Sequence, residues 1–488
     1  MKINNFSLQG ASLDGIILSA VKIVTMGLGL ITTRLLSQYL SIFDYGTYSL
    51  IQLVVSSTVS ITILGMMDGI NYFFCSEKDE GKRDAYIATI YLLQFSVSLL
   101  AGCVIVCAGG QICLYLGTAE ARRLMIYAAV LPFLQNILSM TQVLMLSVGK
   151  AKVLAVRNLV ISLLRLLIVI LVIVFVGSVG IILFMTCILD AAQIIVFFFM
   201  LKKSGCIVHL RKASIQLLRP IIHYCLPMAV YTALNTINRD CDKYIIAAMT
   251  NTETLAVYTN ASKKLPFDLI TSSFITVLLP KITRLISNKE EQETVKVYRA
   301  FLEFSYSSTI ILACGAIAAA PQLMNLLYTE KYLSGISIFV VYILVDIMQF
   351  TNITLILSAS GKTKTLMLLS GGSIVLNIGM NFLLFHLLGV IGPAIATLLI
   401  TSLTGAAILY FSAKKLGTRI TGFFDFRYLI RLLAENIAAV TVLACLRNLL
   451  ESAGLNNLLI LLLICGTYYV ILLALNKKRL IVNLKEIG

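Results

Sequence analysis

Charged residues are scarce in this chain. Only 13% of its 488 residues are Asp, Glu, Lys or Arg, whereas 59% are hydrophobic. Soluble domains carry about 25% charged residues, so this composition excludes an ordinary soluble protein and indicates a polytopic membrane protein. A net charge of +16 would suggest nucleic-acid binding in a soluble chain. In a membrane protein the placement of the charges matters more than their sum, and we expect no nucleic-acid partner.

The chain also lacks the cysteine and histidine patterns of disulfide and metal chemistry. It has 11 Cys but no CxxC pair, and many of the Cys lie inside apolar runs. One CxxH spacing joins Cys206 to His209, without the second pair that a tetrahedral site needs. The other two His, His223 and His386, are too scattered for a metal cluster. We interpret the Cys as small core side chains and expect neither a metal site nor a bound cofactor.

Long polar loops are missing as well. The gaps between apolar segments are short, which excludes a large catalytic module outside the membrane. We therefore predict no catalytic residues and a protein that is not an enzyme. The first apolar segment follows a polar start, Met1 to Asp14, and no small-residue cleavage pattern follows it. We expect no cleavable signal peptide.

What the chain has in abundance is apolar segments near the length of about 20 residues that crosses a bilayer. The sequence predicts an all-α polytopic membrane protein with 14 transmembrane helices. The predicted helices cover residues 15–36, 45–73, 85–109, 124–146, 159–176, 179–200, 220–249, 255–279, 301–327, 336–357, 365–388, 390–412, 429–449 and 458–475.

The Lys and Arg residues predict how these helices are oriented, because cytoplasmic loops carry an excess of both. With a cytoplasmic N-terminus, 28 of the 39 basic residues fall on the inner side, among them Arg157, which we assign to the loop around residues 150–157. Four fall on the outer side, and the remaining seven lie within predicted helices. One missed helix would scramble this alternation. We predict that both termini are cytoplasmic.

Short sequence matches predict an internal duplication. Residues 149–152 (Gly-Lys-Ala-Lys) recur as 361–364 (Gly-Lys-Thr-Lys), and 177–180 recur as 389–392, both at an offset of 212. Residues 46–48 match residues 256–258 at an offset of 210. Two six-helix halves would both enter from the same side, as in the parallel repeats of transporters. The predicted parts are an N-lobe, 1–205 (helices 1–6), a C-lobe, 206–416 (helices 7–12), and helices 13 and 14 with a cytoplasmic tail, 417–488.

Seven charged residues gather on and near the predicted helices 220–249 and 255–279. A charge at the centre of a membrane helix costs roughly 2.5–3.5 kcal/mol, so these side chains should face one another or a wet cavity. The four cations outnumber the three acids, and we interpret them as an anion-binding wall beside structural ion pairs. The alternative is that pairs such as Arg239 with Asp242, or Lys243 with Asp240, only hold the bundle together. The seven residues are Arg239, Lys243, Lys263, Lys264, Asp240, Asp242 and Asp268.

Four further charged residues within predicted helices are candidate site residues. Lys22 and Arg165 have no acidic neighbour at helical spacing, so each needs a partner from another helix or a ligand, unless it snorkels to the headgroups. Asp190 and Asp346 lie near mid-depth. A buried carboxylate without a fixed cation takes up a proton or a metal ion, which would couple transport to a Na⁺ or H⁺ gradient. The alternative is a protonated, hydrogen-bonded side chain without a role.

Two stretches carry a resemblance to a known family. Residues 33–37 (Thr-Arg-Leu-Leu-Ser), followed by 43–48 (Phe-Asp-Tyr-Gly-Thr-Tyr), resemble the N-terminal signature of polysaccharide flippases. Residues 240–246, followed by 256–258, look like the matching element of the second half. These flippases belong to the multidrug/oligosaccharidyl-lipid/polysaccharide exporter superfamily. The predicted number of helices and the two halves also resemble this family, so the resemblance covers nearly the whole chain.

The resemblance implies a flippase of the bacterial inner membrane. It would move undecaprenyl-pyrophosphate-linked, O-antigen-type oligosaccharides from the cytoplasmic to the outer leaflet by alternating access, for lipopolysaccharide and related polysaccharides. The expected partners are this lipid-linked glycan, membrane lipids and polysaccharide assembly proteins. The alternatives are a cation-coupled drug exporter or a lipid II flippase of the same superfamily, and a membrane polysaccharide polymerase.

The same resemblance implies a central cavity whose cations bind the pyrophosphate, a compact anion suited to Lys and Arg donors. The chain has no Trp to stack on sugars, so the sugar contacts fall to Tyr231 and Asn235. The predicted cavity cations are Lys22, Arg165, Arg239, Lys243, Lys263 and Lys264.

Overall fold

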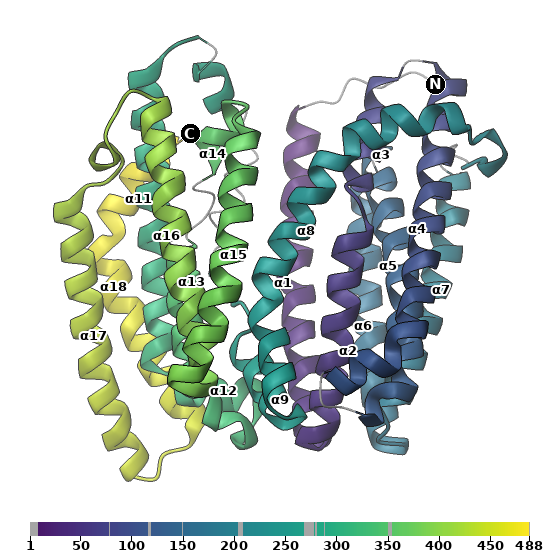
Figure 1. Cartoon of the computed structure of the whole chain (residues 1–488). Coiled ribbons are helices and arrows are strands. Elements are labelled where there is room, and N and C mark those ends of the chain that lie inside the picture. The colour runs from purple at the N-terminus through teal and green to yellow at the C-terminus, as the bar shows by residue number, and fades with distance from the viewer. Residues whose placement is uncertain are drawn as a thin grey trace. The chain divides into compact units, whose positions relative to one another are not determined.

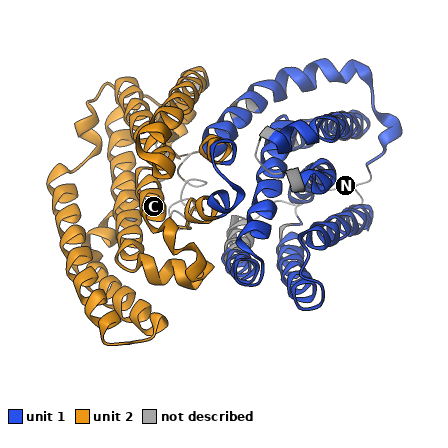
Figure 2. Cartoon of the chain, turned by 60° about the horizontal axis from the view of Figure 1, so that its bottom comes forward, with its two compact units in different colours: residues 1–240, 247–256 blue, residues 241–246, 257–488 orange. Residues whose placement is uncertain are grey.

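A computed structural model of the chain describes residues 8–77, 79–115, 119–148, 150–203, 208–267, 278, 281–286, 288–349 and 354–487. All regular secondary structure within these ranges is helical (Figure 1). The chain divides into two compact units (Figure 2). Unit 1 comprises residues 1–240 and 247–256, and unit 2 comprises 241–246 and 257–488.

Unit 1 is built from seven helices and part of an eighth. Its main packing contacts join α1 to α6, α4 to α5, and α5 to α7. The elements are α1 (Leu8–Tyr39), α2 (Ile42–Thr62), α3 (Met66–Ser76), α4 (Glu80–Tyr115), α5 (Met125–Ser147), α6 (Ala151–Phe175), α7 (Val179–Lys203) and α8 (Leu218–Met249). The helix α8, and after it α9 (Thr252–Ala261), supply residues to both units.

The predicted helix 45–73 is bent, because α2 ends at Thr62 and α3 starts at Met66 at an angle of 41°. Gly65 lies between them in the left-handed conformation, with φ of 66°, which costs glycine little. Two side-chain amides bond to Thr62, the last residue of α2. Gln94 Nε2 donates to the carbonyl of Thr62 at 3.0 Å, and Asn136 Nδ2 donates to the Thr62 hydroxyl at 2.7 Å. The apolar pattern continues through this break, so the sequence did not reveal it.

Unit 2 is organised around one buried helix, α11, against which α13, α17 and α18 pack. The helices α15 and α16 form a second close pair, and α17 lies beside α18 (Figure 1). The elements are α11 (Glu291–Ala318), α12 (Ala320–Tyr328), α13 (Ile336–Met348), α14 (Leu355–Ala359), α15 (Thr363–Leu388), α16 (Gly392–Lys415), α17 (Phe426–Ser452) and α18 (Asn457–Ile487).

A second interruption corrects the predicted helix 255–279. The helix α9 ends at Ala261 and residues 262–267 are not helical, while 268–277 lie outside the described residues. Pro266 disfavours helical conformation at the residue before it and lacks an N–H of its own. The N–H of Leu265 donates instead to Asp346 Oδ2 on α13, at 3.3 Å. A carboxylate distant in sequence thus supports the unwound segment.

The helix bounds follow the offset of the predicted duplication. Adding 210 to the bounds of α1 gives those of α8, and adding 212 to α6 and α7 gives α15 and α16 to within one residue. Gly177 and Gly389 precede equivalent helices with φ of 66° and 67°. Ser41 Oγ and Asn251 Oδ1 accept from the third following N–H at 3.0 and 2.8 Å, at the starts of α2 and α9. This agreement supports the duplication, while the lobe boundaries at 205 and 416 remain predictions.

Nine helical segments in the described part of the chain are long and apolar enough to cross a membrane. The count rises to 11 if each of two bent pairs is one span, and one of the nine, residues 364–415, runs through both α15 and α16. Large apolar side chains such as Leu100, Val174 and Phe199 are exposed on these helices, as expected of lipid-facing surfaces. The protein is a multi-pass membrane protein.

Candidate functional site

Unit 1 contains a polar pocket of about 310 Å³ among α1, α2, α5, α6 and α7. Its polarity is unusual for this chain, since α6 is otherwise among the most lipid-exposed of the helices. Polar residues recur along α6 at spacings of three and four, which places them on one helix face. The lining residues are Thr25, Val59, Gln135, Leu138, Ser139, Gln142, Arg157, Asn158, Ile161, Ser162, Arg165 and Gln193.

A buried ion pair lies at this pocket. Asp190 on α7 is 0% exposed, and its Oδ1 accepts Arg165 Nη2 at 2.7 Å and Gln193 Nε2 at 2.9 Å. Asp190 Oδ2 is buried and has no hydrogen-bond partner among the described residues. The Arg165 side chain remains 45% exposed, so the guanidinium still presents donors to the pocket.

A second arginine faces the same pocket from two turns earlier on α6. Arg157 Nη2 donates to Gln193 Oε1, and Nη1 donates to Asn158 Oδ1 at 2.8 Å. Its guanidinium also lies over the Phe197 ring, 4.5 Å from the centroid, a cation–π contact. Two arginines against one carboxylate leave a net positive pocket, and low surrounding dielectric strengthens its field.

The structure corrects two readings of this region. Arg157 belongs to the membrane-spanning α6 and lines the pocket, so its assignment to a loop was wrong; its eight-residue spacing from Arg165, two helical turns, was the available signal. Asp190 is not a carboxylate without a fixed cation, because Arg165 is its partner. That partner comes from the neighbouring helix, a contact that helical spacing alone cannot show. The side chain of Lys22, on α1, lies outside the described residues.

On α8, Arg239 pairs with the acid that follows it directly in the sequence. Arg239 Nη2 binds Asp240 Oδ2 at 2.8 Å, and the Arg239 side chain is 61% exposed. Asp242 is 1% exposed, and its Oδ2 accepts the hydroxyl of Tyr258 at 2.9 Å and that of Tyr342. The predicted pairing of Arg239 with Asp242 was therefore wrong, because Arg239 binds Asp240 and two phenols of unit 2 bond Asp242 Oδ2. Asp242 Oδ1 is buried without a hydrogen-bond partner among the described residues. Sequence reasoning missed both tyrosines.

The remaining predicted residues are spread along unit 2 and α8. Lys263 and Lys264 are exposed on the unwound segment after α9, which Asp346 supports through its bond to Leu265. Lys243 is half-buried, and Asn235 is exposed on α8. The side chain of Tyr231, and all of Asp268, lie outside the described residues. Of the predicted site residues, Arg165 lines the polar pocket, and its guanidinium binds Asp190.

Comparison with known proteins places the chain in a family and a fold. A family model described as "Polysaccharide biosynthesis protein" matches residues 32–337. This match confirms the resemblance carried by residues 33–48. No curated protein matches the chain.

Solved structures of similar fold are transporters. The lipid II flippase MurJ, in an inward closed conformation, aligns with a TM-score of 0.73 and 18% identity, over 96% of this chain and 100% of its own. An inward-facing multidrug resistance MATE family transporter of the MOP superfamily aligns with a TM-score of 0.67 and 14% identity, over 83% and 98%. A MOP superfamily transporter from Pyrococcus furiosus aligns with a TM-score of 0.57 and 14% identity, over 83% and 95%.

At these identities the neighbours establish the fold alone, and the family match covers well over half of the chain. This multi-pass membrane protein has the MOP-superfamily transporter fold and belongs to the polysaccharide biosynthesis protein family.

Proposed function

We propose that this protein is a flippase for undecaprenyl-pyrophosphate-linked oligosaccharides. It carries O-antigen-type repeat units from the cytoplasmic to the outer leaflet of the bacterial inner membrane by alternating access, and it is not an enzyme. The proposal includes 14 transmembrane helices, cytoplasmic termini and lobes at 1–205 and 206–416, followed by helices 13 and 14. The polar pocket of unit 1 is the observation that carries the proposal.

The pocket suits the headgroup of such a lipid. Arg157 and Arg165 supply planar donor groups matched to phosphate oxygens. Around them, amides such as Gln135 and Gln142 and hydroxyls such as Ser139 supply donors and acceptors for sugar hydroxyls. The pocket volume of about 310 Å³ is in the usual range for a small-ligand site, about 300–1,000 Å³.

Asp190 gives this pocket a means of coupling. Its bond to Arg165 competes with a phosphate for the same guanidinium, so a carboxyl that is neutralised by H⁺ or occupied by Na⁺ would release Arg165 to the substrate. We also assign Arg239, in the unit 1 part of α8, to substrate binding. In unit 2, we assign Lys243, Lys263 and Lys264 to a second cationic surface on the substrate path, with Asp346 controlling the segment that carries Lys263 and Lys264.

The function is tested by complementation of a flippase-deficient strain that makes a defined repeat unit. The double variant Arg157→Gln/Arg165→Gln should lower surface glycan at least about tenfold, because each charge-assisted hydrogen bond is worth about 1.5–3 kcal/mol. The matched control is Lys202→Gln/Lys203→Gln, which removes two exposed cations at the end of α7. Normal surface glycan from a well-expressed double variant would refute the proposal.

A drug exporter of the same superfamily is the rival that this experiment must separate. A net positive pocket repels cationic drugs, so overexpression should give no resistance to them. Measured resistance that depends on Arg157 and Arg165, without complementation of glycan export, would favour the rival.

A further inference from the structure

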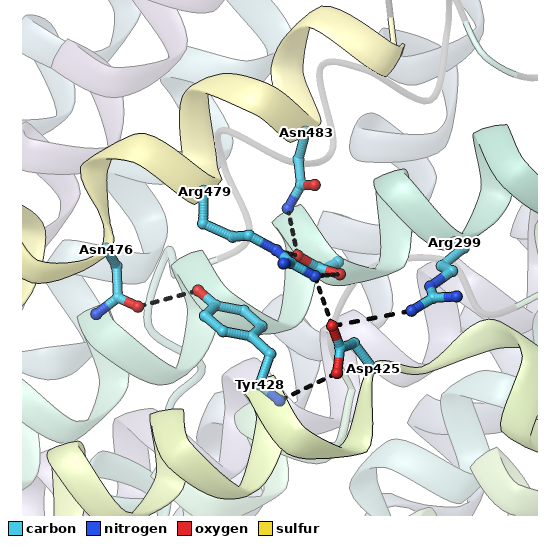
Figure 3. Close-up of polar contacts among 7 residues, drawn as sticks. Arg299, Asp425, Tyr428, Asn476, Arg479 and Asn483 are labelled. Atoms are coloured by element: carbon cyan, nitrogen blue, oxygen red, sulfur yellow. Dashed lines mark hydrogen bonds and ion pairs between the residues drawn. The ribbon is translucent and has the colours of Figure 1, made fainter.

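A second polar cavity lies within unit 2, where α11, α17 and α18 meet (Figure 3). Its volume is about 660 Å³, roughly twice that of the polar pocket in unit 1. The lining residues are Lys296, Arg299, Ala300, Glu303, Tyr428, Arg431, Leu475, Asn476, Lys478, Arg479, Val482 and Asn483.

The acids at this cavity are satisfied by groups of the protein itself. Glu303, with 4% of its side chain exposed, accepts both Nε and Nη2 of Arg479, the latter at 3.0 Å, and Asn483 Nδ2 at 3.0 Å. Asp425 accepts Arg479 Nη2 at 2.7 Å and the N–H of Tyr428 at 3.2 Å. Figure 3 shows Arg479 between these partners. The carboxylates therefore do not need an added cation.

The cations, by contrast, exceed the acids. Five basic side chains line the cavity, and the acids at or beside it are Glu303, Asp425 and Glu435, which binds Arg431 Nε at 2.6 Å. Five cations less three acids leave two positive charges. Lys296 and Lys478 account for this excess, because both are exposed and neither forms an ion pair within the described part of the chain. Their ammonium groups are available to an anion.

The cavity lies at the ends of three membrane-spanning helices. Lys296 and Arg299 are in the first turns of α11, Arg431 is in the second turn of α17, and Lys478 is near the end of the span in α18. Apolar side chains flank the charges on the outer surface, with Ile430, Leu475 and Val482 exposed by 65%, 54% and 50%. Charge and apolar surface adjoin, as an amphiphile at the membrane interface requires.

We propose that this cavity binds the phosphodiester headgroup of an anionic glycerophospholipid. Lys296 and Lys478 contact the phosphate, and the acyl chains lie along Ile430, Leu475 and Val482. The ion-paired Arg479 and Glu303 keep the three helices together beneath the headgroup. The bound lipid is a stationary ligand of unit 2, so the site is independent of the substrate that unit 1 binds.

Native mass spectrometry of the purified full-length protein tests this site. The detergent-solubilised protein is incubated with phosphatidylglycerol or, in a parallel arm, with phosphatidylcholine. The variant Lys296→Gln/Lys478→Gln is compared with Lys414→Gln/Lys415→Gln, which removes two exposed lysines at the end of α16 in the same unit, away from the cavity. Thermal unfolding of each variant establishes that it is folded.

The expected result is retention of phosphatidylglycerol over phosphatidylcholine by the wild type and the control variant. The cavity variant should bind phosphatidylglycerol more than about tenfold more weakly, since each basic residue near an anionic surface contributes roughly fivefold. Equal retention of the two lipids, or equal loss in both variants, would overturn the proposal. Competition by inorganic phosphate alone, at the affinity of the lipid, would show a soluble-anion site and also overturn it.

Discussion

The two units each contain a buried carboxylate held by an arginine, but the arginine bonds its carboxylate partners differently in the two places. At the polar pocket of unit 1, Arg165 pairs with Asp190, which keeps an unsatisfied oxygen, and Arg157 donates to the amide oxygens of Gln193 and Asn158. In unit 2, Arg479 binds two acids, Glu303 and Asp425, Arg299 lies 3.9 Å from Asp425, and Asn483 donates to Glu303. Arg165 donates one hydrogen bond to a carboxylate, which leaves other guanidinium donors available. Arg479 donates three hydrogen bonds to carboxylates.

This difference separates a binding site from a structural joint. An arginine that is shared between two carboxylates gains no further stabilisation from a ligand anion, and its role is to connect helices. An arginine bonded to one carboxylate oxygen, beside a second arginine that bonds neutral amides, still attracts an anion. The following substitutions test whether the two clusters differ in this way, in order of decreasing expected effect.

Arg479→Gln should give the largest change in stability. It leaves Glu303, which is nearly inaccessible, without its cation, and leaves Asp425 with only the more distant Arg299. Loss of one partner of a buried pair costs about 3–5 kcal/mol, and the partial exposure of Arg479 reduces this to about 2–3 kcal/mol. Thermal unfolding can be followed by the reactivity of buried thiols such as Cys113 and Cys225. An unchanged melting temperature would show that the joint is dispensable.

Arg165→Gln/Asp190→Asn removes both charges of the unit 1 pair while keeping groups of similar shape. Stability should change little, because no uncompensated charge remains buried, whereas glycan export should fall about tenfold or more. The matched pair in unit 2, Glu303→Gln/Arg479→Gln, should lower stability and leave export per folded molecule unchanged. If the unit 1 variant lost stability and the unit 2 variant lost export, the binding role would belong to unit 2 and the structural role to unit 1.

Asp190→Asn alone should have a smaller effect of opposite sign on binding. Arg165 would lose its charged competitor, so the affinity for undecaprenyl pyrophosphate should rise by about fivefold, the difference between a charge-assisted and a neutral hydrogen bond. Export should also become less dependent on the proton or sodium gradient. Titration of the purified variant measures the affinity, and a weaker affinity would contradict the competition between Asp190 and substrate.

The smallest expected effect is a pH dependence of stability at Asp425, which lies just before α17. The N–H of Tyr428, followed by the guanidinium groups of Arg479 and Arg299, holds the pKa of Asp425 below its usual value despite partial burial. Its contribution to stability is therefore complete above the unfolded pKa of about 3.9. It is lost as the pH falls further through the folded pKa. Asp425→Asn should flatten the fall in melting temperature below about pH 4, and an identical fall in both proteins would exclude this role.

The sequence predicted the helical class and most helix positions, because crossing a bilayer requires long apolar runs that are visible in one dimension. It also predicted the offset at which the helices repeat. It did not predict the breaks at residues 63–65 and 262–267. At the first break the apolar pattern continues, and Gln94 donates to the carbonyl of Thr62. At the second, Pro266 was a signal in the sequence, and the N–H of Leu265 donates to Asp346.

The candidate site was predicted only in part. Helical spacing identified Arg165 and Asp190 as intramembrane charges, but their contact joins α6 to α7 across 25 residues and depends on how the helices are rotated. Arg157 was assigned to a loop because its charge matched the cytoplasmic pattern. Tyr258 and Tyr342 were not among the predicted site residues, and only the fold brings their hydroxyls to Asp242.

The sequence by itself determined that this protein spans the membrane repeatedly and retains charges within it, since hydropathy and charge are properties of each residue. The tertiary structure alone decided that Arg165 keeps donors available to a ligand, whereas the donors of Arg479 bond carboxylates. That choice depends on distances between side chains of different helices, and these are set by packing in three dimensions.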